Sequence, residues 1–182
     1  MSPSIRALMQ GPLPVTAPLV LNPLMARMAE AAGFPAGYLG GGATGYQKVS
    51  LEANLNLTEM CQAALDIGAV SSLPLILDGA CGYGDPMHMH RTIGMSEAAG
   101  FAGIEIGGQL VAKRAHHHAG IEHMIPAELM AAKVQAAVAA RRSPDFLAIA
   151  RTNGVRASTM DDALRRGEAY KEAGADVLLL SM

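Results

Sequence analysis

Asp78 is the first residue whose type and position could support chemistry. It follows the apolar run 73–77 (LPLIL) and precedes the glycine-rich segment 79–84. A carboxylate at the end of a buried strand, beside a flexible loop, can ligate a hard cation such as Mg²⁺ or Mn²⁺ through oxygen. The same carboxylate could instead cap a turn or the next helix. The local sequence therefore supports both a metal ligand and a capping residue.

Two groups of basic residues could bind an anionic substrate. Arg151 ends the apolar run 146–150 (FLAIA), and a guanidinium on such a rigid element can hold a carboxylate through two parallel hydrogen bonds. An arginine in that place indicates function rather than packing. Lys113 and Arg114 follow another apolar run, 102–106. Beside a metal they would clamp an anion, whereas in solvent they would be an ordinary surface pair.

The histidines are the next candidates, because all of the 6 in the chain lie between positions 88 and 123. His88 and His90, like the run 116–118, suggest zinc, which imidazole commonly binds. However, residues two apart at a helix start point in different directions, and three consecutive histidines cannot all face one metal from a regular element. We therefore predict that histidines of segment 113–123 act as acid, base or carboxylate-binding groups. Solvated loop histidines are the alternative.

The glycine run and the cysteines carry weaker signals. Gly40, Gly41 and Gly42 could cradle an anion with their backbone N–H groups, but the run lacks the Gly-Lys-Ser/Thr ending of a phosphate-binding P-loop. Cys81 has no base beside it in the sequence and is predicted to be structural. With Cys61 as the one other cysteine, a disulfide framework is excluded and reduced thiols are expected.

Composition sets the class of protein. The 182 residues are 51% hydrophobic and 16% charged, which predicts one globular domain over 1–182. A net charge of −2 offers no surplus to neutralise nucleic-acid phosphates. No run of about 18 apolar residues could span a membrane, and the prolines in segment 11–25 would break the helical core of a signal peptide. We expect a cytoplasmic protein with a small-molecule partner, and neither a nucleic-acid nor a membrane partner.

Short apolar runs alternate with helical patterns along the chain. Strands are predicted at 18–22, 36–39, 73–77, 102–106, 146–150 and 177–180. Helices are predicted at 23–32, 58–70, 88–99, 126–142 and 160–173. Thr58 is expected to cap the second of these helices. Three helices end in a similar phrase, at Glu30-Ala-Ala-Gly, Glu97-Ala-Ala-Gly and Glu172-Ala-Gly, which indicates a repeated βα unit.

This alternation implies right-handed crossovers and a parallel sheet. An open doubly wound sheet and a (β/α)₈ TIM-type barrel both fit the order. The polar and glycine-rich residues favour the barrel, because they follow the carboxyl ends of nearly every strand, where barrel active sites are built. A full barrel takes about 250 residues. We therefore expect an incomplete barrel of six βα units, truncated at its C-terminal end, whose unpaired edges promote association.

Taken together, these segments resemble the isocitrate lyase/phosphoenolpyruvate mutase superfamily from about residue 22 to residue 182. The segments that carry the resemblance are Tyr38-Leu-Gly-Gly-Gly42, Leu57-Thr-Glu-Met60, Asp78-Gly-Ala-Cys-Gly-Tyr-Gly84, Lys113-Arg114-Ala-His-His117, Asp145-Phe-Leu-Ala-Ile-Ala-Arg-Thr-Asn153 and Glu172-Ala-Gly-Ala-Asp176. The resemblance implies a (β/α)₈ barrel, a homo-oligomer that is usually a tetramer, and Mg²⁺-dependent chemistry on 2-oxo acids.

The resemblance also implies roles for individual residues. Asp78 corresponds to the direct metal ligand. Arg151 corresponds to the arginine that binds the far end of the substrate. The residues that correspond to the loop around the substrate carboxylate are Tyr38, Gly41 and Gly42. Lys113 and His117 correspond to the lysine and histidine of the gating loop and are taken, with Arg151, as catalytic.

Several positions depart from the family pattern. Ala80 and Gly107 stand where the family has carboxylates around the metal, and Glu52 lies about one residue from another expected carboxylate. Ala115 replaces the catalytic cysteine, which disfavours an isocitrate or methylisocitrate lyase.

We therefore predict a Mg²⁺-dependent decarboxylase or carbon–carbon lyase that acts on a small 2-oxo or 2-hydroxy acid, such as oxaloacetate, through a metal-stabilised enolate. The alternatives are a catalytically silent or truncated barrel of the same superfamily, or a methylisocitrate lyase-like or phosphonomutase-like enzyme.

Overall fold

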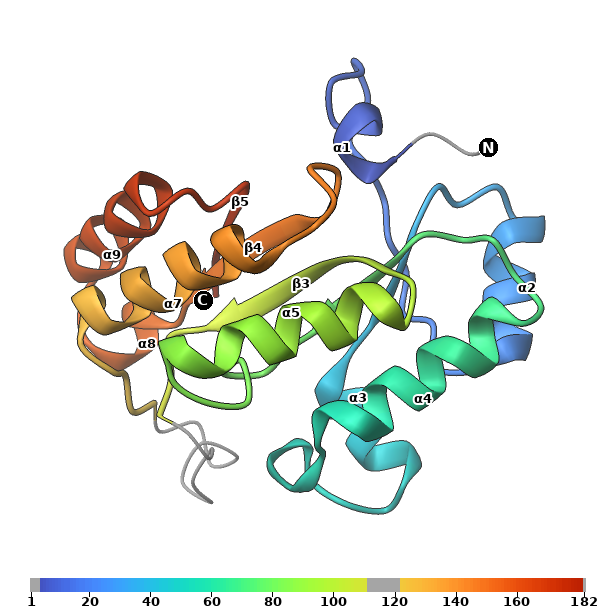
Figure 1. Ribbon diagram of the computed structural model, residues 1–182, viewed down its shortest axis with the longest axis horizontal. Coiled ribbons are helices and arrows are strands. Elements are labelled where there is room, and N and C mark those ends of the chain that lie inside the picture. The colour runs from blue at the N-terminus through green and yellow to red at the C-terminus, as the bar shows by residue number, and fades with distance from the viewer. Residues whose placement is uncertain (1–3, 111–121, 182) are drawn as a thin grey trace.

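A curved parallel sheet forms the centre of the molecule, shown in a computed structural model that describes residues 4–110 and 122–181 (Figure 1). In the described residues its five strands neighbour one another in chain order, and every neighbouring pair is parallel. The strands are β1 (Gly37–Leu39), β2 (Leu75–Asp78), β3 (Phe101–Gly107), β4 (Leu147–Thr152) and β5 (Val177–Leu180). Sequential order with a helix between neighbours is the pattern of a βα barrel and not of a doubly wound sheet.

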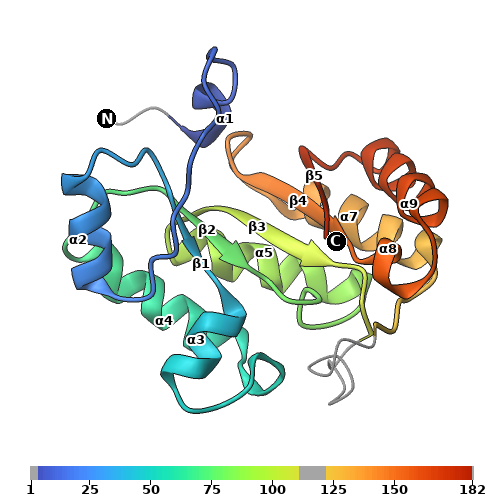
Figure 2. The same cartoon turned by 180° about the vertical axis from the view of Figure 1, so that it is seen from behind.

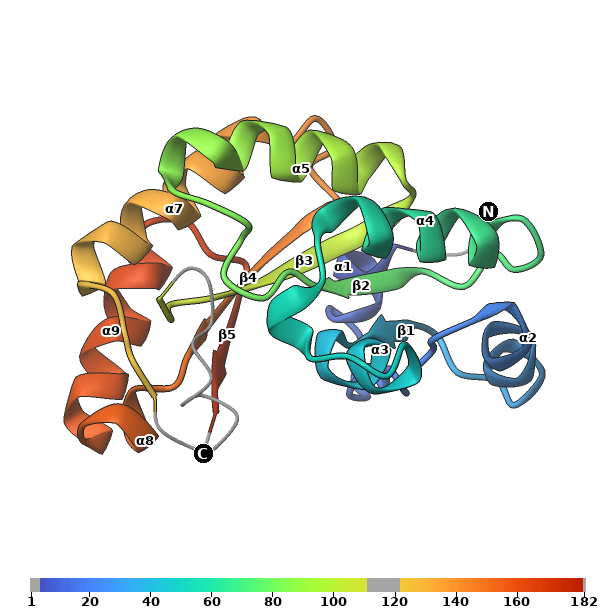
Figure 3. The same ribbon diagram turned by 90° about the horizontal axis from the view of Figure 1, so that it is seen from below.

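The long helices pack on one side of this sheet. They are α2 (Pro23–Ala31), α4 (Leu57–Gly68), α5 (Met89–Ala98), α7 (Ala127–Ala140) and α9 (Met160–Glu172). Figure 3 shows α4, α5, α7 and α9 following one another in an arc around the strands. The shorter elements are α1 (Ile5–Leu8), α3 (Gly41–Gln47), α8 (Gly154–Ala157) and the 3₁₀ turns η1 (Glu52–Asn54) and η2 (Pro86–His88).

The main hydrophobic core lies between the sheet and these helices. Leu77, Ile104 and Ile106 point outward from β2 and β3 and are at most 2% exposed. They belong to one buried cluster with residues such as Met60 of α4 and Met130 of α7. This packing fixes which residues of each strand face the opposite, inner side, because side chains alternate along a strand.

Side-chain caps set the starts of α2 and α4, and one of these caps differs from the prediction. Asn22 caps α2 by accepting a hydrogen bond from the Met25 N–H at 3.0 Å. Asn56, and not Thr58, caps α4: its Oδ1 accepts from the Glu59 N–H, while the Glu59 carboxylate accepts from the Asn56 N–H. The prediction for Thr58 was wrong because this reciprocal capping box satisfies two of the free N–H groups of the helix, more than a lone threonine can.

The repeated Ala-Gly phrases are helix-terminating motifs, as the sequence predicted. Gly33, Gly100 and Gly174 all have positive φ, between +81° and +98°. After α2, the Gly33 N–H donates to the Glu30 carbonyl and the Phe34 N–H to the Ala29 carbonyl, each at 3.0 Å. That double hydrogen bond closes the helix and turns the chain toward the next strand.

The first predicted strand is reduced to a single bridge. In segment 18–22, the Val20 N–H donates to the Tyr38 carbonyl and the Tyr38 N–H to the Pro18 carbonyl, each at 2.9 Å. The segment is extended and parallel to β1, but it is too short for a strand because Asn22 already caps the following helix. The six strands of the sequence prediction are therefore five strands and one bridge in the described residues.

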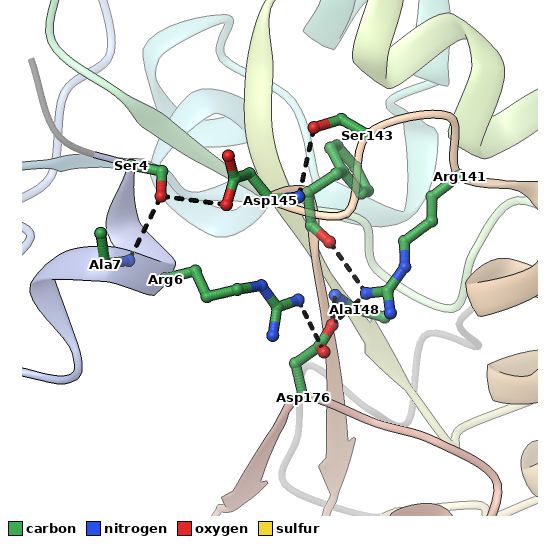
Figure 4. A network of polar contacts seen from close by, with 9 residues as sticks. Ser4, Arg6, Ala7, Arg141, Ser143, Asp145, Ala148 and Asp176 are labelled. Atoms are coloured by element: carbon green, nitrogen blue, oxygen red, sulfur yellow. Dashed lines mark hydrogen bonds and ion pairs between the residues drawn. The ribbon is translucent and has the colours of Figure 1, made fainter.

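A polar network holds α1 against the amino ends of β4 and β5 (Figure 4). Its centre is Asp176, whose carboxylate accepts from Arg6 Nη2 at 2.7 Å, from Arg141 Nη1 at 2.5 Å and from the Ala148 N–H at 2.8 Å. Ile5 of α1 is 2% exposed and packs on the inner face of the sheet. The helix thus covers the inner face at the end opposite to α3 and α8 (Figure 2).

We expect Asp176→Asn to lower the free energy of unfolding by about 2 kcal/mol near neutral pH, since hydrogen bonds to charged groups are lost. Burial by itself would raise the pKa of Asp176, but the Ala148 N–H, Arg6 and Arg141 outweigh it and lower that pKa. This stabilisation is present above the unfolded-state pKa of about 3.9 and is lost as pH falls through the folded-state value.

Urea unfolding of both proteins at about pH 7 and about pH 3 checks this prediction. Asp161→Asn, which changes an exposed carboxylate at the start of α9, is the matched control and should leave stability nearly unchanged. An Asp176→Asn effect of the same size at both pH values would show that the contribution is not electrostatic.

Candidate active site

Asp78 lies at the carboxyl end of β2 and is 7% exposed. Its Oδ2 accepts a hydrogen bond from the Gly41 N–H at 2.9 Å, and its Oδ1 accepts one from the Ala80 N–H at 3.0 Å. The carboxylate therefore closes a turn, as one of the two sequence interpretations holds. Each carboxylate oxygen keeps a further lone pair, so the capping role leaves metal ligation open.

Strand register places four polar side chains on the inner face of the sheet. Asp78 pairs with Glu105, and Gly107, two residues along β3, pairs with Arg151. Tyr38 pairs with Ile76, which lies two residues before Asp78. Because partners in a sheet and residues two apart share a face, Tyr38, Asp78, Glu105 and Arg151 all point inward near the carboxyl ends of the strands.

Glu105 joins three of the strands through its carboxylate. It is 4% exposed, it accepts a hydrogen bond from the Tyr38 hydroxyl at 2.8 Å, and its other oxygen binds Arg151 Nη1 in a salt bridge. The sequence prediction missed Glu105. The available signal was a carboxylate inside the otherwise apolar run 102–106, at an inward position.

Arg151 is held in place but is not saturated. Its Nη1 donates to Glu105 and its Nη2 donates to Gln109 Oε1 at 3.2 Å. Its Nε is buried and has no hydrogen-bond partner in the part of the chain that the structure describes. Burial would lower the pKa of Arg151, but Glu105, Asp78 and other groups raise it, so the guanidinium keeps its charge. A buried, charged donor without a partner is costly, which indicates a ligand group at this place.

The glycine at position 107 makes room for this arrangement. A Cβ there would lie 2.9 Å from Arg151 Nη2 and 3.0 Å from the Ala80 carbonyl oxygen. Any side chain at 107 would therefore displace the arginine or the Asp78 loop. Glycine at this position therefore leaves room for the Arg151 side chain beside the Asp78 loop.

A second group of polar side chains lies beside Arg151, and the sequence prediction missed it as well. Gln109 Nε2 donates to Glu122, and Asn153 Nδ2 donates to the same carboxylate at 3.3 Å. All three residues are at most 9% exposed. The Leu110 N–H donates to the His123 carbonyl at 2.9 Å, so the chain on either side of segment 111–121 is paired. This group links that segment's ends to Arg151.

The described residues fit a sparse magnesium site. Glu52 Oε1 and Asp78 Oδ2 lie 3.1 Å and 3.2 Å from the point where a Cβ on Gly41 would stand, so the two carboxylates lie near each other beside this glycine. Mg²⁺ is commonly bound by one or two carboxylates together with waters and substrate. No group of three or more His, Cys, Asp or Glu side chains suited to a metal occurs among residues 4–110 and 122–181.

Two tyrosines near Asp78 are kept in the protonated form. Burial raises the pKa of Tyr38, and the Asp78 and Glu105 carboxylates raise it further. Burial likewise raises the pKa of Tyr83, with added effects from Asp78 and Glu52. Both hydroxyls therefore stay protonated at neutral pH and act as hydrogen-bond donors, as Tyr38 does toward Glu105.

Of the other predicted site residues, some lie beside Asp78 and others do not. Gly41 begins α3 and contacts Asp78, while a Cβ on Gly42 would meet nothing within 4 Å. The run 40–42 is thus a helix start, not the loop that the sequence suggested, and the Gly41 N–H binds the protein's own carboxylate. Cys81 is buried. Lys113 and His117 lie outside the described residues.

A sequential parallel sheet with helices on one face, and polar side chains at the carboxyl end of the other, defines a protein of the TIM-barrel type. The chain belongs to the phosphoenolpyruvate phosphomutase family, whose model matches residues 5–182. This match confirms the superfamily resemblance and the α/β fold that the sequence predicted. Among the described residues, no helix is both long and apolar enough to cross a bilayer.

The chain is similar in sequence to relatives that are named for different reactions. A probable 2-methylisocitrate lyase of Corynebacterium glutamicum is 34% identical over 176 residues, which is 96% of this chain and 57% of that protein. An oxaloacetate decarboxylase of Paraburkholderia xenovorans is 33% identical over 168 residues, 91% of this chain and 56% of that protein. The chain therefore spans less than two thirds of the length of these relatives.

Solved structures agree with the fold. The phosphoenolpyruvate phosphomutase of Streptomyces platensis superposes with a TM-score of 0.91 at 32% identity, covering 97% of this chain and 62% of that one. A phosphonopyruvate hydrolase in complex with oxalate and Mg²⁺ superposes with a TM-score of 0.83, also at 32% identity, covering 91% and 57%.

Proposed function

We propose that the protein is a Mg²⁺-dependent carbon–carbon lyase that decarboxylates a small 2-oxo acid such as oxaloacetate. One observation supports this most: the charged guanidinium of Arg151 is buried on the inner face, near Asp78, with Nε–H unpaired. That donor suits a carboxylate. The relatives named above include both a decarboxylase and a lyase, so cleavage next to a carboxylate is the shared chemistry.

Each residue of the site has a separate role in this proposal. Asp78 and Glu52 would hold Mg²⁺, which supplies a Lewis acid for the 2-oxo group of the substrate. Arg151 binds and orients a substrate carboxylate, and Glu105 fixes the position of the guanidinium. The protonated Tyr38 hydroxyl donates to Glu105 and so helps to fix that carboxylate on the same face. We assign Lys113 and His117, which lie outside the described residues, to charge neutralisation and to delivery of the final proton.

We expect Asp78→Ala to weaken Mg²⁺ and Mn²⁺ binding at least tenfold, because one of only two nearby carboxylates is removed. Binding by the unaltered protein should itself be weak, since Ala80 and Gly107 lack outer carboxylates whose loss typically lowers affinity about 10–100-fold. Isothermal calorimetry with each metal measures both effects.

Asp66→Ala is the matched control, because this carboxylate is exposed on α4 and accepts its hydrogen bond from Gln62. It should leave metal affinity unchanged. Equal binding by Asp78→Ala and the unaltered protein would place the metal elsewhere, and the histidines of segment 113–123 would become the candidates.

A catalytically silent member of the family is the second candidate function. It is favoured by the missing carboxylates at Ala80 and Gly107. An assay for pyruvate release distinguishes the two: a silent protein would bind oxalate through Arg151 but turn over no 2-oxo acid. We further propose a homo-oligomer, which light scattering of the purified chain tests.

A further inference from the structure

The loop that follows Asp78 has an unusual backbone. Ala80 and Tyr83 have φ values of +50° and +58°. Gly82 and Gly84 have φ values of +82° and +154°. Residues with a side chain rarely adopt the left-handed region, and they do so only where the surroundings hold them there. The conformation of segment 79–84 must therefore be maintained by contacts outside the segment itself.

Four consecutive carbonyl groups of the loop are each tied to a donor. The Gly79 carbonyl accepts from the Gly82 N–H, and the Ala80 carbonyl accepts from the Gly107 N–H of β3, both at 2.7 Å. The Gly82 carbonyl accepts from Thr92 Oγ1 at 3.0 Å. The remaining carbonyl, that of Cys81, accepts from Lys133 Nζ.

Packing alone does not explain a lysine at position 133. It lies on α7 among the buried apolar residues Met130, Val134 and Ala137, and it is 1% exposed. No carboxylate of the described residues lies within salt-bridge distance of its Nζ. Buried lysines are rare unless paired, so an ammonium with no ion-pair partner among the described residues indicates a local task.

The surroundings of Lys133 act on its pKa in both directions. Burial lowers the pKa of Lys133, while Cys81 and Asp85 raise it. The Cys81 carbonyl oxygen is the one acceptor of Nζ in the described structure. A hydrogen bond from an ammonium is stronger than one from a neutral donor, and it is directed at the middle of the left-handed loop.

We propose that Lys133 is a positioning residue, whose ammonium group holds the Cys81 carbonyl and thereby maintains the loop conformation that orients the Asp78 carboxylate. The connection is short: the Ala80 N–H, two peptide units before the Cys81 carbonyl, donates to Asp78 Oδ1 at 3.0 Å. Rotation of the Ala80–Cys81 region would move that donor. The consequence for metal binding rests on the proposed function, whereas the consequence for the loop does not.

The first test is Lys133→Met, which keeps the length of the side chain and removes the charge. Amide hydrogen exchange at Gly82 and Gly107 reports the loop directly, because both N–H groups bind loop carbonyls. We expect exchange to accelerate at least tenfold at these amides and Mn²⁺ affinity to fall at least tenfold. Met130→Leu, a packing change one turn away, and Lys171→Met, an exposed lysine of α9, should change neither measurement.

The second test is chemical rescue. Lys133→Ala should regain slow exchange at Gly82 and Gly107 in n-propylammonium chloride, which carries the atoms that the substitution removes, but not in sodium chloride at equal ionic strength. If this variant folds only in the amine salt, that dependence supports the proposal as well. Identical behaviour in both salts would overturn it.

The outcomes separate this inference from the proposed function. Exchange at Gly82 and Gly107 that is as slow in Lys133→Met as in the unaltered protein overturns the positioning role. If the unaltered protein binds no Mn²⁺, the metal part of the proposed function fails, and the exchange and rescue measurements still decide the role of Lys133.

Discussion

Replacing Arg151 with methionine is expected to weaken oxalate binding by about 10²–10⁴-fold. Oxalate is a suitable probe because it presents the paired carboxylate oxygens of a small 2-oxo acid without being cleaved. Each charge-assisted hydrogen bond contributes about 1.5–3 kcal/mol, and tenfold in affinity corresponds to about 1.4 kcal/mol. Loss of two such bonds from the guanidinium accounts for the expected change. Calorimetry in the presence of Mg²⁺ measures it.

Two further variants make the result specific to Arg151. Arg165→Met removes an arginine of α9, whose side chain is 70% exposed and pairs with Asp162, and should bind oxalate as the unaltered protein does. Arg151→Lys keeps the charge but not the planar fork of donors, so its affinity should fall between those of the methionine variant and the unaltered protein. Unchanged binding by Arg151→Met would place the anion site elsewhere.

Sequence periodicity was sufficient for the long elements and insufficient for the short ones. The helices with a clear apolar stripe and a terminal glycine, such as α2 and α9, lie within a few residues of their predicted ranges. α3 was missed because its sequence begins with glycines, which disfavour a helix. Tertiary contacts hold it instead: Gly45 packs against the Glu52 backbone, and the Gly41 N–H donates to Asp78 Oδ2 at 2.9 Å.

The candidate site was predictable where one residue carried the signal. Asp78 and Arg151 each end an apolar run, so their positions at the carboxyl edge of the sheet follow from strand direction alone. Glu105 was not predictable in its role, because its partners Tyr38 and Arg151 are 67 and 46 residues away in the chain. One sequence does not show which side chain a buried carboxylate will meet across a sheet. The close approach of Gly107 to the Arg151 side chain was not predictable for the same reason.

The second large effect concerns the choice of substrate. We expect oxaloacetate to release pyruvate at least about 100-fold faster than 2-methylisocitrate does. Cleavage of the 2-hydroxy acid needs a base for the hydroxyl and an acid for the departing carbon, and a positioned proton donor typically contributes about 10²–10⁴-fold. Ala115, which lies outside the described residues, replaces the cysteine to which the superfamily resemblance gives that role.

Oxaloacetate makes smaller demands on the same site. It already carries its 2-oxo group, so the electron pair of the breaking carbon–carbon bond passes toward that group as CO₂ leaves, and one proton delivered to C3 then completes pyruvate. Arg151 has to hold the substrate so that the breaking bond is aligned with the 2-oxo group. A coupled pyruvate assay with each substrate, at equal protein and Mg²⁺ concentrations, measures the ratio of rates.

Ala115→Cys provides the matched variant for this comparison. If the missing acid limits cleavage of 2-methylisocitrate, the cysteine should raise that rate and leave oxaloacetate decarboxylation little changed, so the ratio between the two substrates falls. Faster cleavage of 2-methylisocitrate by the unaltered protein would contradict the decarboxylase proposal. If neither substrate is turned over while oxalate still binds through Arg151, the site binds carboxylates without the metal environment that bond cleavage needs, and the carboxylates missing at Ala80 and Gly107 are the physical reason.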